Sequence, residues 1–244
     1  MRKGARSRAE VPPEVLAALN AGTMETASLP ECLAVDFAAL MGAVFPAIDP
    51  APLEVAAGDG VTRRMALAAE LAAEHLDTMA GHGSDTVRGW ACYAIGRRPG
   101  WTLAQRLERL RPLADDPHFG VREWAWLALR PHVVAEPRAA IALLAPWTAE
   151  ASANLRRFAS EATRPRGVWC AHVAALRADP APGLAVLEPL RADPARYVQD
   201  SVANWLNDAG KDHPDWVRDL CQCWTKDGGG KAIAYVVRRA CRNL

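Results

Sequence analysis

The 244-residue sequence lacks most of the motifs by which catalytic and cofactor-binding proteins are recognised. It contains no glycine-rich phosphate loop, no HExxH pair, and no Ser, His and Asp at the spacing of a hydrolytic triad. Its six cysteines include no CxxC pair and share no zinc-ligand spacing with its six histidines. We therefore expect no metal and no other cofactor, and we expect the cysteines to be reduced.

Long apolar runs are also absent. No stretch approaches the roughly 18 apolar residues that indicate a membrane-spanning helix, and the basic start of the chain is not followed by the apolar segment of a secretory signal. We expect a monomeric protein of the cytoplasm with no membrane partner. Residues 1–11, which include four basic side chains, are predicted to be a disordered tail, and residues 12–244 a single domain.

Tyrosine and phenylalanine are scarce, with three and four residues, whereas tryptophan occurs nine times. Trp is a common core residue, and beside Arg it also suits stacking on nucleic-acid bases. The net charge of +1 conceals an asymmetry: residues 151–244 contain 14 Lys and Arg against 10 Asp and Glu, while residues 1–150 contain 15 against 18. The C-terminal part is therefore the better candidate for a polyanion-binding surface.

No strand pattern is present, and helical periodicity recurs along the chain. Asp49 is predicted to cap a helix that begins at Pro50. Apolar spacing, with Pro, Gly, Ser and Asp at the boundaries, predicts further helices at about 12–20, 31–44, 62–80, 101–114, 137–146, 150–163, 167–178 and 213–225.

The helix starts repeat at a regular interval. Val87, Val121 and Leu155 lie 34 residues apart, and each precedes an Arg. Val198 follows 43 residues later, and Val236 a further 38 residues on. Two helices per period of this length predict an all-α fold, an α-solenoid of HEAT-like repeats whose second half lines a concave face with Arg-rich helices. The repeat does not specify what binds there.

A charged stripe that the core does not require lies on the helix before Pro165. Arg157, Glu161 and Arg164 share one face of this helix, and Trp169 is predicted to open the next helix after a turn. One carboxylate between guanidinium groups, with a Trp nearby, is consistent with an active site that holds a phosphate backbone. It is also consistent with a solvated ion-pair face, which the pattern alone favours because such pairs are common on helix surfaces.

A second polar face is predicted farther along the chain. The side chains at i, i+3, i+4 and i+7 of its helix are Asn204, Asn207, Asp208 and Lys211. Helix capping and turn formation explain them as well as phosphate contact does, so both interpretations stay open. Glu123 is a further carboxylate off the core face, on a helix with two Trp residues.

Two segments resemble the motifs of a known family. The pattern RR-x-x-SE-x-TRPR-x-x-W matches residues 156–169, and the pattern SVAN-x-LND-x-x-KDHP matches residues 201–214. Both are typical of the HEAT-like-repeat DNA alkylation-repair glycosylases, the AlkC/AlkD superfamily, and of its AlkC branch in particular. The resemblance extends from about Phe45 to the C-terminus.

Three features depart from the family pattern. Tyr235, in a last helix similar to KAI-x-W-x-x-R, stands where AlkD-type members have a catalytic Trp. AlkC-type members place an acidic residue before an Arg-Pro pair; here Trp126 occupies that position before Arg130, and Glu123 lies one helical turn earlier as a candidate substitute. Many AlkC-type members also have an immunoglobulin-like domain that grips DNA. This chain ends at Leu244 without one, so weaker DNA binding or a smaller footprint is expected.

The resemblance implies a monofunctional DNA glycosylase of base excision repair. Such an enzyme hydrolyses the N-glycosidic bond of cationic N-alkylated bases, 3-methyladenine first, in double-stranded DNA and without deep base flipping. The implied catalytic residues are Glu161, Glu123 and Trp169, of which Trp169 would pack on the lesion or its deoxyribose. The candidate DNA-contacting residues are Arg122, Trp126, Arg156, Arg157, Arg164, Arg166, Asn204, Asn207, Asp208, Lys211, Tyr235 and Arg238.

A non-catalytic HEAT-repeat scaffold is the alternative. Trp126 in place of the acidic residue, Tyr235 in place of Trp, and the missing accessory domain motivate it, because some members of the superfamily bind DNA without excising a base. Its partner would be branched or damaged DNA, or a protein.

Overall fold

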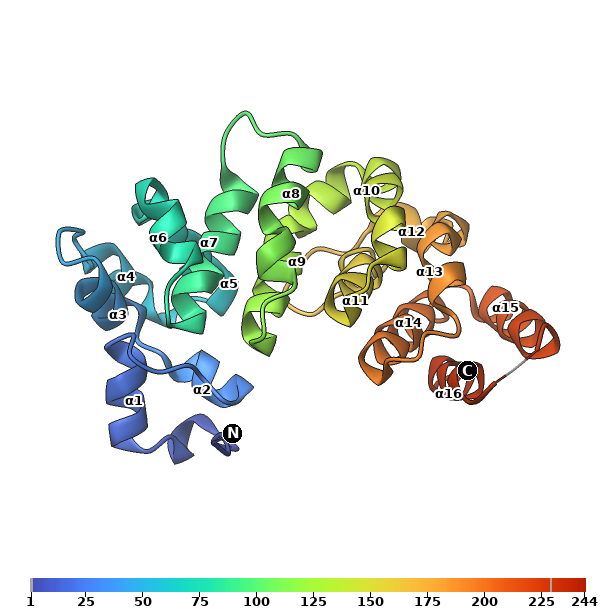
Figure 1. The fold of residues 1–244 in the computed structure, drawn as a ribbon, viewed down its shortest axis with the longest axis horizontal. Helices are drawn as coiled ribbons and strands as arrows, with labels where there is room; N and C mark the ends of the chain where they lie inside the picture. Colours follow the sequence, from blue (N-terminus) through green and yellow to red (C-terminus); the bar gives the residue numbers. More distant parts are fainter. Residues whose placement is uncertain (1, 229) are drawn as a thin grey trace. The chain divides into compact units, whose positions relative to one another are not determined.

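The computed structural model describes residues 2–228 and 230–244, and over these residues it contains helices, turns and loops but no strand. No helix in this part of the chain is long and apolar enough to cross a membrane. The α-helices, labelled as in Figure 1, are α1 (Pro13–Asn20), α2 (Leu29–Ala34), α3 (Phe37–Val44), α4 (Ala51–Val55), α5 (Val61–Leu71), α6 (Leu76–Ala80), α7 (Asp85–Arg97), α8 (Leu103–Ala114), α9 (Phe119–Ala135), α10 (Pro137–Leu144), α11 (Ala153–Ala162), α12 (Ala174–Ala178), α13 (Leu184–Leu190), α14 (Arg196–Ala209), α15 (Pro214–Lys226) and α16 (Lys231–Ala240).

The helices form two compact units. The first comprises the chain up to Trp101 together with residues 116–128, and the second comprises residues 102–115 and 129–244. Helix α9 contributes its first part to the first unit and its remainder to the second. That residues 12–244 behave as a single domain stays a prediction.

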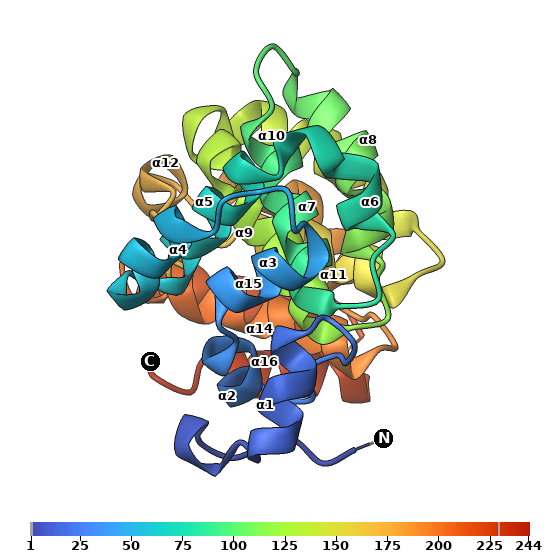
Figure 2. The same ribbon diagram turned by 90° about the vertical axis from the view of Figure 1, so that its left-hand side faces the viewer.

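The first unit is built around α7, which is buried along nearly its whole length. Helices α5 and α6 pack against α7, and α3 packs against α5; Figure 2 shows α3, α5 and α7 close together. The Trp90 ring is fully buried and meets the Phe37 ring edge-on, with centroids 5.7 Å apart. This core explains the sequence pattern, since α7 carries apolar residues on more than one face and therefore has to be covered from several sides.

Residues 2–11 are not a disordered tail, contrary to the prediction. The Arg2 guanidinium donates to both carboxylate oxygens of Glu31, at 2.7 and 2.6 Å, and the amides of Ala5 and Ala27 donate to the same group. Glu31 is fully buried. The hydrogen bond from Arg2 lowers its pKa to about 2, against the opposing effect of burial. Composition could not show this anchor, because Glu31 lies 29 residues from Arg2.

Replacing Glu31 by Gln tests this anchor. The pKa of about 2 in the folded protein lies below the ordinary value of 4.5, so the ionised carboxylate stabilises the fold above pH 4.5 and loses this effect as the pH falls toward 2. Near neutral pH the variant should unfold at a lower temperature than the native protein, and the difference should shrink on acidification. Thermal unfolding followed by circular dichroism measures both. Glu14→Gln, which removes the same charge from an exposed side chain, should change little; a Glu31→Gln difference independent of pH would refute the anchor.

In the second unit α14 lies between α11 and α16, and it packs extensively against both (Figure 1). The Trp205 side chain of α14 is fully buried, and its indole Nε1 donates to the Thr163 carbonyl at 3.1 Å, just beyond the end of α11. Gly183 lies against the same indole so closely that a Cβ there would overlap the ring. Trp205 therefore fixes the end of α11 relative to α14.

The Arg residues of the repeat have a shared structural role. In each case Nη1 donates to the carbonyls six and five residues earlier: Arg88 to His82 and Gly83, Arg122 to Asp116 and Pro117, and Arg156 to Glu150 and Ala151. Arg88 and Arg156 also fork onto the carboxylates of Asp116 and Asp193, which accept from the backbone amides of His118 and Ala195 just before later helices. At the fourth start Gln199 donates to the carbonyl of Asp193, again six residues earlier. The predicted repeat thus has a physical basis in helix-start loops that are held by side-chain donors.

Several predicted helices are divided. The helix predicted for residues 31–44 breaks at Asp36, whose carboxylate accepts from the Ala38 and Ala39 amides and starts α3. The helix predicted for residues 62–80 becomes α5, a 3-10 turn and α6. Asp49 does accept from the amide of Ala51, so its capping role is confirmed.

In the second unit one predicted helix is wrong and one helix was missed. The helix predicted for residues 167–178 is reduced to α12, and residues 164–173 form a loop that contains Trp169. Helix α13 was not predicted, because Pro189 interrupts its sequence pattern and a Pro-rich turn precedes it.

Candidate functional site

Glu161 lies at the centre of the charged stripe on α11. The side chain is 3% exposed, and both carboxylate oxygens have partners. Oε1 accepts from Nη1 of Arg164 at 2.6 Å, and Oε2 accepts from the hydroxyl of Ser201 at 2.7 Å. Nη2 of Arg157 is 3.5 Å from Oε2. Ser160 in turn donates to the Ser201 hydroxyl at 2.7 Å, which orients Ser201 toward the carboxylate.

The electrostatic surroundings keep Glu161 ionised. Burial by itself would raise its pKa, but the charges of Arg157 and Arg164 and the hydrogen bond from Ser201 outweigh burial and lower the pKa. The same burial disfavours the Arg164 cation, yet Glu161 and Asp208 raise its pKa. A buried carboxylate held between two guanidinium groups is thus the dominant charged feature of this helix. The solvated ion-pair face, which the pattern alone favoured, does not describe it.

Arg164 connects the two polar faces identified in the sequence. Its Nε and Nη2 donate to Oδ2 of Asp208 on α14, at 2.9 and 2.7 Å, while Nη1 holds Glu161. Lys211 donates to the other oxygen of Asp208 at 3.2 Å. Asp208 is 5% exposed and Lys211 is exposed. Together with Arg157, which approaches Glu161, the structure therefore brings five of the predicted site residues into one continuous network.

Trp169 lies in the loop of residues 164–173 that follows α11. The loop is closed by the Val173 amide, which donates to the Pro165 carbonyl at 2.9 Å. The Trp169 side chain is 46% exposed, and its backbone has φ of 63°, the left-handed region that costs a bulky residue about 1–2 kcal/mol. A large exposed aromatic side chain in a disfavoured backbone conformation is typical of a functional position.

The remaining predicted residues of the second unit fall into two groups. Asn207 and Arg166 have structural contacts: Asn207 Nδ2 donates to the Ala240 carbonyl at 3.0 Å, and Arg166 Nη2 donates to both oxygens of Asp212, at 2.8 and 3.0 Å. The pKa of Asp212 is lowered to about 2, chiefly by the hydrogen bond from Arg177 and to a smaller extent by the hydrogen bond from Arg166. The fork of Arg156 on Asp193 is likewise structural, which the sequence did not indicate.

The second group forms a basic face across α11, α14 and α16. Arg157 lies over the Tyr197 ring, with Cζ 4.4 Å from the centroid, and Arg196 lies over the Tyr235 ring at 3.4 Å. The Tyr235 hydroxyl donates to Asp200 at 2.6 Å. The basic face, which the sequence pattern indicated only in part, comprises Arg157, Arg196, Arg238, Arg239 and Arg242, with Asn204 accepting from Arg242 at 3.1 Å.

Ser201, Tyr197 and Arg196 were not among the predicted site residues. Ser201 was present in the matched SVAN pattern, and Tyr197 precedes it by one helical turn on the same face of α14. A helical-wheel comparison of α11 with α14 could have found both. The contact of Ser201 with Glu161 spans 40 residues, so only the fold identifies it.

The predicted residues on α9 belong to the first unit. Trp126 is 5% exposed, and its indole Nε1 donates to Oε2 of Glu123 at 2.7 Å. Glu123 is half-buried. Arg122 binds the two carbonyls before α9, as described for the repeat. The Trp126 ring is therefore part of the core, and its hydrogen bond holds the half-buried Glu123 carboxylate.

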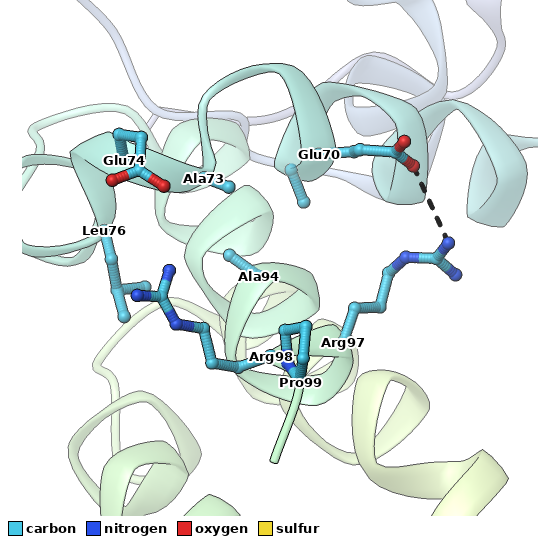
Figure 3. Close-up of a pocket in the computed structure, with 9 residues that line it drawn as sticks. Glu70, Ala73, Glu74, Leu76, Ala94, Arg97, Arg98 and Pro99 are labelled. Carbon is cyan, nitrogen blue, oxygen red and sulfur yellow. Dashed lines mark ion pairs between the residues drawn. The ribbon is translucent and has the colours of Figure 1, made fainter. Parts of the chain in front are cut away.

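A hollow in the first unit lies elsewhere. It has a volume of about 680 Å³, and Figure 3 shows that Glu70, Glu74, Arg97 and Arg98 surround it together with small apolar residues. Arg97 pairs with Glu70 at 3.7 Å. None of the predicted site residues lines this hollow, so it is not the candidate site. Within residues 2–228 and 230–244 no cluster of three or more His, Cys, Asp or Glu residues is arranged to hold a metal ion.

Comparisons with known proteins agree with the resemblance found in the sequence. Residues 103–239 match the family model described as DNA alkylation repair enzyme. The chain is 34% identical over 142 residues to the uncharacterized protein YhaZ of Bacillus subtilis, which amounts to 58% of this chain and 38% of YhaZ.

Two solved structures are similar to this one. The alkylpurine DNA glycosylase AlkC of Pseudomonas fluorescens, solved bound to DNA containing an abasic site analog, has a TM-score of 0.63 and 27% identity over 88% of this chain and 62% of AlkC. AlkD2 of Streptococcus mutans has a TM-score of 0.60 and 20% identity, covering 76% of this chain and 91% of AlkD2. The predicted all-helical fold of HEAT-like repeats is confirmed, and the chain spans less than two thirds of both YhaZ and AlkC.

Proposed function

The chain belongs to the DNA alkylation repair enzyme family, and we propose that it is a glycosylase that hydrolyses the N-glycosidic bond of cationic N-alkylated bases, 3-methyladenine first, in double-stranded DNA. The observation that carries the proposal is the buried, ionised Glu161 between Arg157 and Arg164. Release of free 3-methyladenine from methylated duplex DNA, with an abasic site left behind, tests the assignment.

The chemistry needs little more than one well-placed carboxylate. A cationic base is already a good leaving group, so acid catalysis is not required, and the developing charge is on the deoxyribose, which becomes oxocarbenium-like. The Glu161 carboxylate stabilises that positive charge and orients the attacking water. The longest contact of the Glu161 carboxylate is with Arg157, whose Nη2 lies 3.5 Å from Oε2. A sugar or a water therefore competes for the carboxylate most easily at Oε2.

Trp169 is proposed to contact the lesion. Its exposed indole offers a π face to a cationic base, and this cation–π attraction is worth about 0.5–2 kcal/mol depending on desolvation. A neutral base gains none of that charge-dependent term. The selectivity for alkylated bases would thus come from the charge of the lesion and not from a deep pocket, which is consistent with excision without deep base flipping.

The basic face is proposed to hold the DNA backbone. The row consists of arginines on α11, α14 and α16 and in the turn that follows α16, and phosphate contacts from such a row fix register without reading sequence: Arg157, Arg196, Arg238, Arg239 and Arg242. Lys211 extends the row from the Asp208 end. Tyr235 is held by Asp200 and Arg196, so it supports the arginines around it.

Glu123 is proposed as the second carboxylate. Its hydrogen bond to Trp126 connects it to the position where AlkC-type proteins have their acidic residue, one helical turn later. Glu123 belongs to the first unit, so its role is tested separately from that of Glu161: native base release by Glu123→Gln would exclude Glu123 from the chemistry.

Arg157→Ala should weaken binding to duplex DNA of any sequence and reduce the slope of log K against log salt by about one unit, because one phosphate contact is lost. Fluorescence anisotropy over a salt series measures it. Arg218→Ala is the matched control, since Arg218 is an exposed cation of the same unit that pairs with Asp215 outside the basic face, and its slope should equal that of the native protein. An affinity for DNA that does not depend on salt would contradict the basic face as the DNA-binding surface.

A non-catalytic scaffold is the second candidate. Two observations favour it. Trp126 stands where AlkC-type proteins have an acidic residue, and the Tyr235 hydroxyl already donates its hydrogen bond to Asp200. Such a protein would bind methylated and unmethylated duplexes without releasing any base, and it would show the same salt dependence. Base release therefore distinguishes the two candidates, whereas DNA affinity does not.

A further inference from the structure

Arg130 is a buried cation whose hydrogen bonds, over the described residues, all go to backbone carbonyls. The residue, on α9, is 1% exposed. Its Nε donates to the Ala171 carbonyl at 2.9 Å and its Nη1 to the Ala162 carbonyl at 3.0 Å, while Nη2 is buried without a hydrogen-bond partner. Among the described residues no carboxylate lies within ion-pair distance of this guanidinium. Burial accordingly lowers the pKa of Arg130.

A cation in such surroundings is costly to keep. Transfer of a charged group from water into the interior is unfavourable unless a partner compensates for it, and two carbonyls compensate only partly. A neutral side chain of similar volume would be less costly at this position. The feature that a neutral side chain could not reproduce is the planar fork, which binds two acceptors at a fixed separation.

The two acceptors belong to the two halves of the candidate site. Ala162 is the last residue of α11 and follows Glu161 directly. Ala171 lies two residues after Trp169, inside the loop that Val173 closes onto Pro165. One guanidinium therefore connects the end of the helix that carries the carboxylate to the loop that presents the indole.

We propose that Arg130 is a positioning residue that sets the location of Trp169 relative to Glu161. The proposal rests on the proposed glycosylase function for its catalytic consequence, but its structural part concerns the loop alone. Arg130 contacts neither the lesion nor the DNA backbone; it acts through the Ala162 and Ala171 carbonyls. Loss of the fork would remove the hydrogen bond that holds the Trp169 loop at Ala171, and a displaced indole can lower the rate by up to roughly 30-fold, as much as removal of the indole would.

Two variants and one control test the proposal. Arg130→Met removes both donors and fills the same space, and Arg130→Lys keeps the charge but has no planar fork. Arg64→Met is the control, because Arg64 is also a nearly buried Arg with a lowered pKa, on α5 of the first unit and outside the proposed machinery. Each protein is measured for hydrogen exchange of the loop of residues 164–173, for the steady-state kinetics of base release (kcat and KM), and for the affinity for unmethylated duplex DNA.

We expect both Arg130 variants to exchange the amides of this loop at least about tenfold faster, while the rest of the second unit is unchanged. We expect kcat to fall by up to roughly 30-fold, the limit set by loss of the indole contact, with DNA affinity close to native because the basic face is intact. Arg64→Met should lower stability and leave loop exchange and kcat at native values. If Arg130→Met fails to fold, Arg130→Lys supplies the same comparison.

Three results would overturn the proposal: native loop exchange in both Arg130 variants, faster exchange with native kcat, or full rescue by Lys, which would mean that charge and not the fork matters. If the native protein itself releases no base, the proposed glycosylase function fails. Loop exchange then decides the role of Arg130 by itself, since faster exchange confined to the loop supports the fork and native exchange refutes it.

Discussion

Glu161→Gln should reduce the release of 3-methyladenine by roughly 100- to 1000-fold, the range typical when one electrostatic group is removed from a preorganised site. The variant keeps the shape of the side chain but removes the charge that would stabilise the oxocarbenium-like sugar. DNA affinity should stay equal or rise, because a negative charge beside the phosphates is lost. Single-turnover release from methylated duplex, together with binding to unmethylated duplex, separates the two effects.

The same substitution should also lower stability. Removing one partner of a buried ion pair typically costs about 3–5 kcal/mol, and here Arg157 and Arg164 would lose the charge between them. Activity must therefore be measured well below the unfolding midpoint. Asp116→Asn is the matched control, because it breaks the buried fork with Arg88 and should lower stability without affecting base release. Native release rates in Glu161→Gln, or an equal loss in Asp116→Asn, would remove Glu161 from the chemistry.

The pH dependence of the reaction follows from the same surroundings. The lowered pKa of Glu161 means that its ionised form persists below the ordinary value of 4.5. Any stabilisation or activity that requires the ionised carboxylate is then fully present above that value and is lost only as the pH falls through the lower folded-state pKa.

Trp169→Gly should reduce release of the cationic base by up to roughly 30-fold, which corresponds to a cation–π term of about 2 kcal/mol at 1.36 kcal/mol per tenfold change. Trp169→Ala should lose activity to the same extent. The two variants should differ in stability: glycine adopts a φ of 63° without penalty, whereas alanine does not, so the Gly variant should have the higher Tm. Thermal unfolding and base release on the same samples test both statements.

Val168→Ala is the control for this experiment. Val168 is 68% exposed beside Trp169, and it has no part in the proposed chemistry, so its variant should release base at the native rate. A Trp169→Gly protein with native activity would contradict the placement of the lesion against the indole. Equal stability of the Gly and Ala variants would mean that the backbone strain is not real.

The sequence predicted the repeat and the face of α11 well, because both depend on local spacing. Apolar periodicity places Arg157, Glu161 and Arg164 on one side of a helix whatever the fold around it. The Val-Arg starts recur because each Arg binds the loop just before its own helix, a contact of five or six residues' separation. Because such contacts are local, they produce a regular spacing that is visible in the sequence.

The features that the sequence did not predict depend on contacts between residues far apart in the chain. Arg156 and Arg157 are adjacent and chemically identical, yet one is taken up by Asp193, 37 residues away, and the other faces Glu161 and Tyr197. Trp169 was predicted to open a helix, but the loop around it is held by Arg130, 41 residues before Ala171. Propensity could not anticipate either contact, since each depends on which helices the fold brings together.

The most direct test is a single incubation of the native protein with duplex DNA that contains 3-methyladenine, in which the released base and the abasic sites are both quantified. We predict one free 3-methyladenine per abasic site, no cleavage of the DNA strand, and almost no release by Glu161→Gln under the same conditions. Binding to the methylated duplex without release of any base would contradict the proposed glycosylase function and favour the scaffold.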